Sequence, residues 1–140
     1  MLLKPREIPG RLAAGAYILH SGIEKWASEE DRAKALHGMA AKAYPFLADV
    51  PPATFVRALA TAEIATGALI LAPFVPAAVA GAALSGFAAS LLVMYARTPA
   101  LRNPGSIWPS PAGIAVSKDV WMLGIGAGLL VDAWARRRAS

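Results

Sequence analysis

The sequence contains no cysteine and only two histidines, and both shortages exclude several kinds of chemistry. Without cysteine the chain offers no disulfide and no thiolate for catalysis, for an iron–sulfur cluster or for a zinc site. Two histidines leave little for a site built on nitrogen ligands, so we expect no metal. The sequence also has no serine-protease-like triad, zinc-protease motif or phosphate loop. It therefore carries no intrinsic catalytic motif, and whether the protein is an enzyme stays open.

Charged residues are also scarce. They make up 16% of the 140 residues, whereas soluble domains average about 25%. Hydrophobic residues account for 56%, and the mean hydropathy is +0.47. A soluble domain of this size needs more polar surface than these residues supply, and the same numbers exclude a disordered chain. The composition therefore predicts one integral membrane domain over residues 1–140.

The net charge is +5, and the Lys and Arg residues cluster at the ends of apolar runs. A basic soluble protein would suggest nucleic acid, but no basic face with interleaved aromatic residues is present. Basic residues that flank apolar segments instead mark membrane topology and contacts with lipid headgroups. We therefore expect the lipid bilayer, and not nucleic acid, as a partner.

Apolar runs predict an all-α, integral membrane four-helix bundle with spans at about 8–26, 52–71, 77–96 and 118–134. The first span has a short apolar centre, so Arg11 and Lys25 should extend outward from its ends to reach water. Residues 28–44 combine an N-cap at Ser28 and early acids with an apolar stripe. This pattern predicts an amphipathic helix between spans one and two, on the membrane surface or the bundle rim.

The basic residues also predict the orientation. Four spans place both ends of the chain on one side, and these ends carry Lys4, Arg6, Arg11 and three arginines at 136–138. The positive-inside rule then places both ends in the cytoplasm. Residues 28–44 and the proline-rich loop 97–117 would face outward. Because loops of this length are usually functional or disordered, we expect the two segments to form one cap that contacts a partner.

Glu63 is the most informative residue because it lies near the middle of the second span. A carboxyl at that depth costs about 2.5–3.5 kcal/mol or more unless it is paired, protonated or facing water. Tyr17 and His20 on the first span and Ser90 on the third lie at a similar depth, so we expect these four residues in one polar pocket. The pocket either binds a ligand or handles protons, or it is an interhelical hydrogen bond that fixes the bundle.

Lys25, Lys118 and Asp119 lie at outer helix ends and predict an ion-pair cluster at the outer rim, or simple interfacial charges. The fourth span carries two further signals. Asp132 should pair with one of the three arginines that follow it or with Arg11. A GxxxG pair at 124 and 128 favours close packing inside the bundle over a seam between two copies.

Several short motifs resemble those of DoxX-like membrane proteins. Residues 11–15 (Arg-x-x-x-Gly) and 20–25 (His-x-Gly-x-x-Lys) are similar to the first helix of that family, and 63–71 (Glu-x-x-x-Gly-Ala-Leu-Ile-Leu) to the second. Residues 117–124 (Ser-Lys-Asp-Val-Trp-Met-Leu-Gly) look like the closing helix. The resemblance covers roughly residues 8–135. It implies a four-helix protein of the bacterial inner membrane.

The resemblance also implies a redox association, because family members include a thiosulfate:quinone oxidoreductase subunit and proteins that work with periplasmic redox enzymes. Some relatives carry cysteine pairs, but this chain cannot run a thiol–disulfide cycle. It would have no cofactor of its own, and any redox role would depend on a bound quinone or on a larger membrane or periplasmic complex. We therefore expect a membrane subunit or anchor of such a complex, with a pocket for a quinone or lipid. The alternatives are an accessory subunit that docks a partner through its outer loops and, less favoured, a small transporter.

Overall fold

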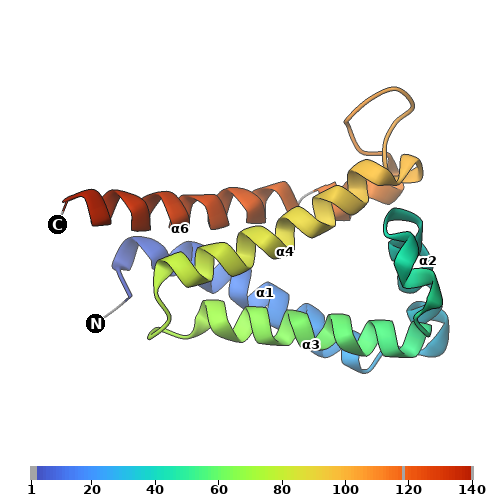
Figure 1. Cartoon of the computed structure of the whole chain (residues 1–140), viewed down its shortest axis with the longest axis horizontal. Coiled ribbons are helices and arrows are strands. Elements are labelled where there is room, and N and C mark those ends of the chain that lie inside the picture. Colours follow the sequence, from blue (N-terminus) through green and yellow to red (C-terminus); the bar gives the residue numbers. More distant parts are fainter. Residues whose placement is uncertain (1–2, 118, 140) are drawn as a thin grey trace.

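The computed structural model describes residues 3–117 and 119–139, in which regular structure is helical apart from one isolated β-bridge. The longest helices are α1 (Ile8–Trp26), α3 (Pro52–Leu71), α4 (Ala77–Arg97) and α6 (Asp119–Ala139). They run side by side in alternating directions, so both ends of the chain lie together (Figure 1). We call this the terminal end. The shorter helix α2 (Glu30–Ala43) crosses the opposite end, which we call the α2 end.

Helix boundaries follow from local chemistry. Pro52 lies in the first turn of α3, and Pro76 directly precedes α4. Proline is tolerated there because the first N–H groups of a helix have no partner inside it. The predicted segments 8–26 and 52–71 coincide with α1 and α3. The fourth helix continues five residues beyond the predicted end at Trp134, because alanine and arginine favour helix.

Three helical segments are long and apolar enough to cross a membrane: α3, α4 and the segment Pro111–Ala139, which contains α5 (Ile114–Ser117) and α6. Helix α1 is not among them, because its 19 residues include Arg11, Glu24 and Lys25. The described residues therefore form an all-α protein with three candidate membrane-spanning helices.

The long helices form two closely packed pairs. Helix α1 packs along α3 and α4 packs along α6, with much less contact between the pairs. A Cβ added at Gly67 would lie 2.7 Å from the backbone nitrogen of Leu19. In the second pair, a Cβ at Gly81 would lie 2.8 Å from the carbonyl oxygen of Gly126. Small residues thus allow close backbone approach within each pair.

The expected packing role of Gly124 and Gly128 is wrong. A Cβ built at either residue meets no atom within 4 Å, whereas Gly126 lies against α4. Successive helical residues are about 100° apart, so residues two positions from Gly126 lie on the opposite face of α6. The two glycines of the motif therefore face away from the bundle.

The main apolar core lies between the two pairs, towards the terminal end. Its largest fully buried side chains are Ile18, Ile70 and Leu84, one from each of three helices. A second cluster, formed by Ala40, Ala43 and Met94, joins α2 to α4. The two pairs thus meet in a shared apolar core towards the terminal end, and α2 bridges them at the other end.

Candidate functional site: a cavity at the α2 end

A cavity of about 440 Å³ lies where α2 bridges the two helix pairs. This size falls in the range of small-molecule sites, about 300–1,000 Å³. Side chains from all the long helices and from α2 line it, and most of them are apolar. They include Met39, Phe55, Leu59, Phe87, Met94 and Met122. The cavity therefore suits the apolar part of a ligand.

The amphipathic helix α2 covers one side of the cavity. Its apolar stripe, represented by Leu36, Met39 and Tyr44, lines the cavity. The Tyr44 hydroxyl donates a hydrogen bond of 2.7 Å to the carbonyl oxygen of Ser90, which ties the end of α2 to α4. Of the two predicted places for this helix, the structure shows the bundle rim, with the apolar face turned inward.

Glu63 forms the polar part of the cavity together with two residues of α1. Its side chain is 5% exposed, and its carboxylate lies 3.2 Å from the Lys25 ammonium. The Ser21 hydroxyl lies 3.4 Å from the same carboxylate and accepts a 2.6 Å hydrogen bond from Lys25. Ser21 and Lys25 are four residues apart, so they lie one turn apart on one face of α1. Glu63 thus faces inward and is paired.

The structure brings together three of the four predicted pocket residues. Glu63, Tyr17 and Ser90 all line the cavity, with Tyr17 73% exposed at its edge. The expected contact between His20 and Glu63 is not formed, because His20 is exposed and no polar partner for it occurs among the described residues. At about 100° per residue, His20 lies about 160° around α1 from the buried Ile18. A depth similar to that of Glu63 was therefore not sufficient to place His20 in the pocket.

The predicted outer-rim residues Lys25 and Asp119 both line the cavity, and Asp119 interacts electrostatically with Lys25 and Glu63. Lys118 lies outside the described residues. Lys25 does not extend outward to water as expected, because Glu63 attracts its ammonium group into the bundle. Sequence reasoning missed Ser21. Its spacing of four residues from Lys25 and three from Ile18 is the signal that could have found it.

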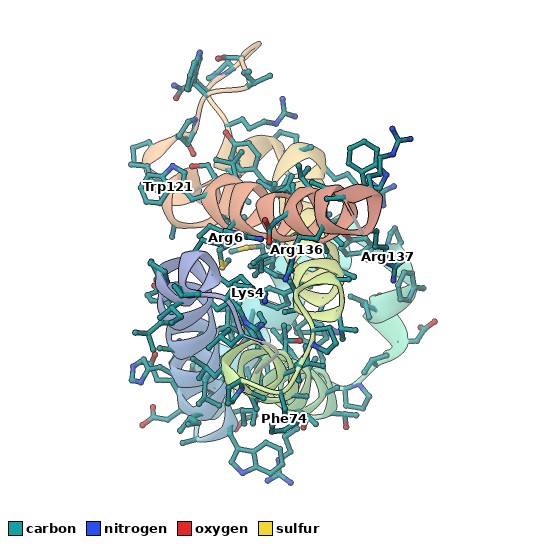
Figure 2. The ribbon with its side chains drawn as sticks, turned by 90° about the vertical axis from the view of Figure 1, so that its left-hand side faces the viewer. Lys4, Arg6, Phe74, Trp121, Arg136 and Arg137 are labelled. Atoms are coloured by element: carbon teal, nitrogen blue, oxygen red, sulfur yellow. The ribbon has the colours of Figure 1, made fainter. Side chains whose placement is uncertain are left out.

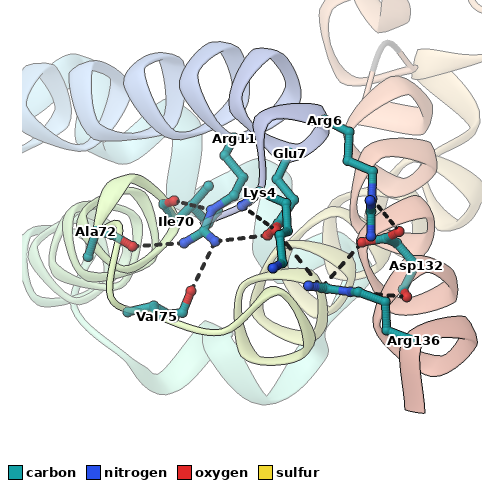
Figure 3. A network of polar contacts seen from close by, with 9 residues as sticks. All are labelled: Lys4, Arg6, Glu7, Arg11, Ile70, Ala72, Val75, Asp132 and Arg136. Atoms are coloured by element: carbon teal, nitrogen blue, oxygen red, sulfur yellow. Dashed lines mark hydrogen bonds and ion pairs between the residues drawn. The ribbon is translucent and has the colours of Figure 1, made fainter. Parts of the chain in front are cut away.

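A polar network closes the terminal end (Figure 3). Arg11 does not extend outward as expected, because its guanidinium donates to the carbonyl oxygens of Ile70, Ala72 and Val75 at 2.8–2.9 Å. Carbonyls at a helix end have no partner inside the helix, so the buried guanidinium supplies one. Glu7 also pairs with Arg11 at 3.2 Å. The network therefore fixes the α3–α4 turn against α1.

Asp132 pairs with Arg136 at 3.2 Å, which is the first of its two expected pairings. It also pairs with Arg6 at 2.7 Å. The second pair connects α6 to the start of the chain. Figure 2 views the terminal end and shows Lys4, Arg6, Arg136 and Arg137 there. The basic residues at the two ends of the sequence thus form one positively charged surface.

The expected single cap of two outer segments is formed only in part. Helix α2 and the short α5 line the cavity, but no residue between 98 and 113 does so among the described residues. The loop between Arg102 and Pro109 instead projects away from the bundle (Figure 1). Its tip residues Ile107 and Trp108 are 76% and 70% exposed.

Comparison of the chain with known protein families, curated proteins and solved structures finds no match. The residues at 3–117 and 119–139 contain no group of three or more histidines and carboxylates that could hold a metal ion. What the site offers chemically is an apolar chamber with a hydrogen-bonded ion pair in its wall. Such a chamber suits a molecule that is apolar along most of its length and polar at one end.

Proposed function

We propose that this protein crosses the bilayer four times and holds a membrane-soluble amphiphile, a quinone or a lipid, in the cavity at the α2 end. The observation that carries the proposal is the apolar cavity, whose wall contains the buried pair of Lys25 and Glu63. In a quinone complex, Lys25 and Ser21 offer donors for a carbonyl oxygen. The quinone would supply redox chemistry that the chain lacks.

The packing of α1 supports its place as a fourth span. A bilayer crossed by α3 would also surround α1, because the two helices pack along one another. The 19 residues of α1 span about 28 Å, close to the thickness of the bilayer core. Two of its charged residues, Arg11 and Lys25, face protein atoms instead of lipid. The third, Glu24, lies near the helix end and pairs with Arg32 at 3.5 Å.

The positive surface at the terminal end supports an orientation with that end in the cytoplasm of a bacterial cell. Because the chain has no cysteine, single cysteines report accessibility without background. Asn103→Cys should react with an impermeant maleimide in intact cells, and Ala139→Cys should react only after the membrane is opened. The reverse pattern would contradict this orientation, and reaction of both in intact cells would contradict the even number of spans.

Ligand binding is tested on the purified protein. Lipid extraction and mass spectrometry should detect a quinone or lipid that stays bound in about equal amount to the protein. Ala115→Trp places an indole at the cavity wall and should reduce the retained ligand. Ala112→Trp is the matched control, because Ala112 is exposed and does not line the cavity. Equal retention by both variants, or no retained ligand in the parent protein, would contradict the proposal.

The resemblance to DoxX-like proteins extends the proposal to a membrane subunit or anchor of a redox complex. Crosslinking and mild solubilisation of native membranes should then recover the protein with a larger complex. Recovery of the protein alone would count against this part of the proposal and leave the proposal of ligand binding unaffected.

A second candidate is an accessory subunit that docks a partner through its outer loop, and the tip of that loop favours it. Ile107 and Trp108 are exposed, yet the loop is held by hydrogen bonds such as that from the backbone N–H of Asn103 to the carbonyl oxygen of Trp108, at 2.9 Å. Trp108→Ser should release a docked partner. Val93→Ser is the control, because it changes an exposed apolar residue outside the loop and should leave the partner bound.

A further inference from the structure

A second pocket, of about 400 Å³, opens at the α2 end on the outer side of the α1–α3 pair. The end of α1, the start of α2 and the start of α3 form it. Its charged residues are Lys25, Lys34, Arg57 and Glu30. Lys25 is paired with Glu63, and Lys34 with Glu30 at 3.1 Å. Among the described residues Arg57 has no carboxylate partner, so its charge is available to an anion.

Ser28 gives this pocket an unused polar atom. The sequence predicts Ser28 as the N-cap of α2, but the helix begins after Glu29 and has no side-chain cap. The Ser28 hydroxyl is buried and has no hydrogen-bond partner among the described residues. Buried polar groups are nearly always hydrogen-bonded, so an orphan hydroxyl in the wall of a pocket points to a ligand. A hydroxyl and a guanidinium together suit a phosphate oxygen.

An apolar groove continues from this pocket along the outer side of α1 and α3. Trp26 lines both the pocket and the groove, and Ile23, Thr61 and Ile64 complete the groove. Along α1, Ile23 lies before Trp26, and along α3, Thr61 and Ile64 follow Arg57. On both helices the groove therefore lies on the side of the pocket that is nearer the middle of the bundle. The Arg57 guanidinium lies 5.7 Å from the centre of the Trp26 ring, at the junction of the two hollows.

We infer that this pocket and groove bind one phospholipid, with its phosphate at Arg57 and Ser28 and an acyl chain along Ile23 and Ile64. The four-span arrangement proposed above places the pocket at headgroup level, where exposed tryptophans such as Trp26 are common. An anionic lipid is preferred, because each lysine of the pocket is paired with a carboxylate whereas the positive charge of Arg57 has no carboxylate partner among the described residues. A free phosphate would use the same polar atoms but not the groove.

The test uses the full-length protein in nanodiscs of phosphatidylcholine and phosphatidylglycerol, released gently for native mass spectrometry. The parent protein should retain one phosphatidylglycerol. Arg57→Gln should weaken retention about tenfold, because it removes a hydrogen bond between charged groups. Arg32→Gln removes an arginine at the same end that does not line the pocket, and it should retain lipid like the parent. Equal retention by the two variants would overturn the inference.

Two further variants separate a binding role from a structural one and lipid from free phosphate. Ser28→Ala should reduce lipid retention severalfold without lowering stability, because the hydroxyl has no partner to lose. Thr61→Trp should fill the groove and displace the lipid. If Ser28→Ala destabilises the protein and leaves retention unchanged, or if excess inorganic phosphate displaces the lipid and Thr61→Trp has no effect, the lipid site is refuted. None of these outcomes depends on a ligand in the cavity lined by Glu63.

Discussion

Removing one member of the Lys25–Glu63 pair should have very different effects depending on which member is removed. Lys25→Met leaves the Glu63 carboxylate, which is 5% exposed, with only the Ser21 hydroxyl at 3.4 Å. Glu63→Gln leaves Lys25 with its 2.6 Å hydrogen bond to Ser21. Lys25 is also one residue from the end of α1, so its ammonium can extend towards water. Glu63 lies mid-helix and has no such route.

The magnitudes follow from burial. Breaking a buried pair costs about 3–5 kcal/mol when the remaining charge stays buried, which is the situation in Lys25→Met. For Glu63→Gln we expect a cost of about 1–2 kcal/mol, because the lysine keeps one bond and can reach solvent. The double variant removes both charges, so it should be more stable than Lys25→Met alone. The coupling free energy should be about 1–3 kcal/mol.

The assay is reversible unfolding in mixed micelles of increasing dodecyl sulfate content, followed by tryptophan fluorescence. The matched control is the exposed pair of Lys34 and Glu30, whose nitrogen and oxygen are 3.1 Å apart. Lys34→Met and Glu30→Gln should show coupling of no more than about 0.5 kcal/mol. If Glu63→Gln destabilises as much as Lys25→Met, or if both cycles give the same coupling, the buried-pair reasoning is refuted. Ligand retention by Glu63→Gln then separates a binding role from a packing role.

The remaining predictions concern packing and anchoring. Arg11→Lys should destabilise by about 2–4 kcal/mol in the same unfolding assay, because an ammonium cannot replace a planar guanidinium that serves three carbonyls; a change under about 0.5 kcal/mol would argue against the network. Gly67→Ala should cost about 1–3 kcal/mol by overpacking α1 against α3, whereas Gly128→Ala should be neutral or stabilising; equal effects would contradict the helix pairing. Tyr44→Phe removes the bond to Ser90, so hydrogen exchange should quicken in α2 and not in α6.

The sequence determined the helical class and most helix bounds, because these depend on local chemistry. Apolar runs separated by prolines predicted helices over 8–26 and 52–71, and both helices have these bounds in the structure. The basic ends of the chain and the amphipathic helix in 28–44 could also be predicted, since both depend on residue type and helical spacing. Depth along a helix was readable too, and it placed Tyr17, Glu63 and Ser90 at the same cavity.

Only the tertiary structure decided which way each helix is turned about its own axis. Helices α3 and α4 are apolar on nearly every side, so periodicity leaves their buried face undefined. Packing against these two helices selects Gly126 of α6 over the GxxxG pair, and it leaves His20 of α1 exposed. The same packing brings Arg11 and Lys25 inward, because unpaired carbonyls and a buried carboxylate attract them more strongly than water does. Those partners come from other helices, and a single segment of sequence does not contain them.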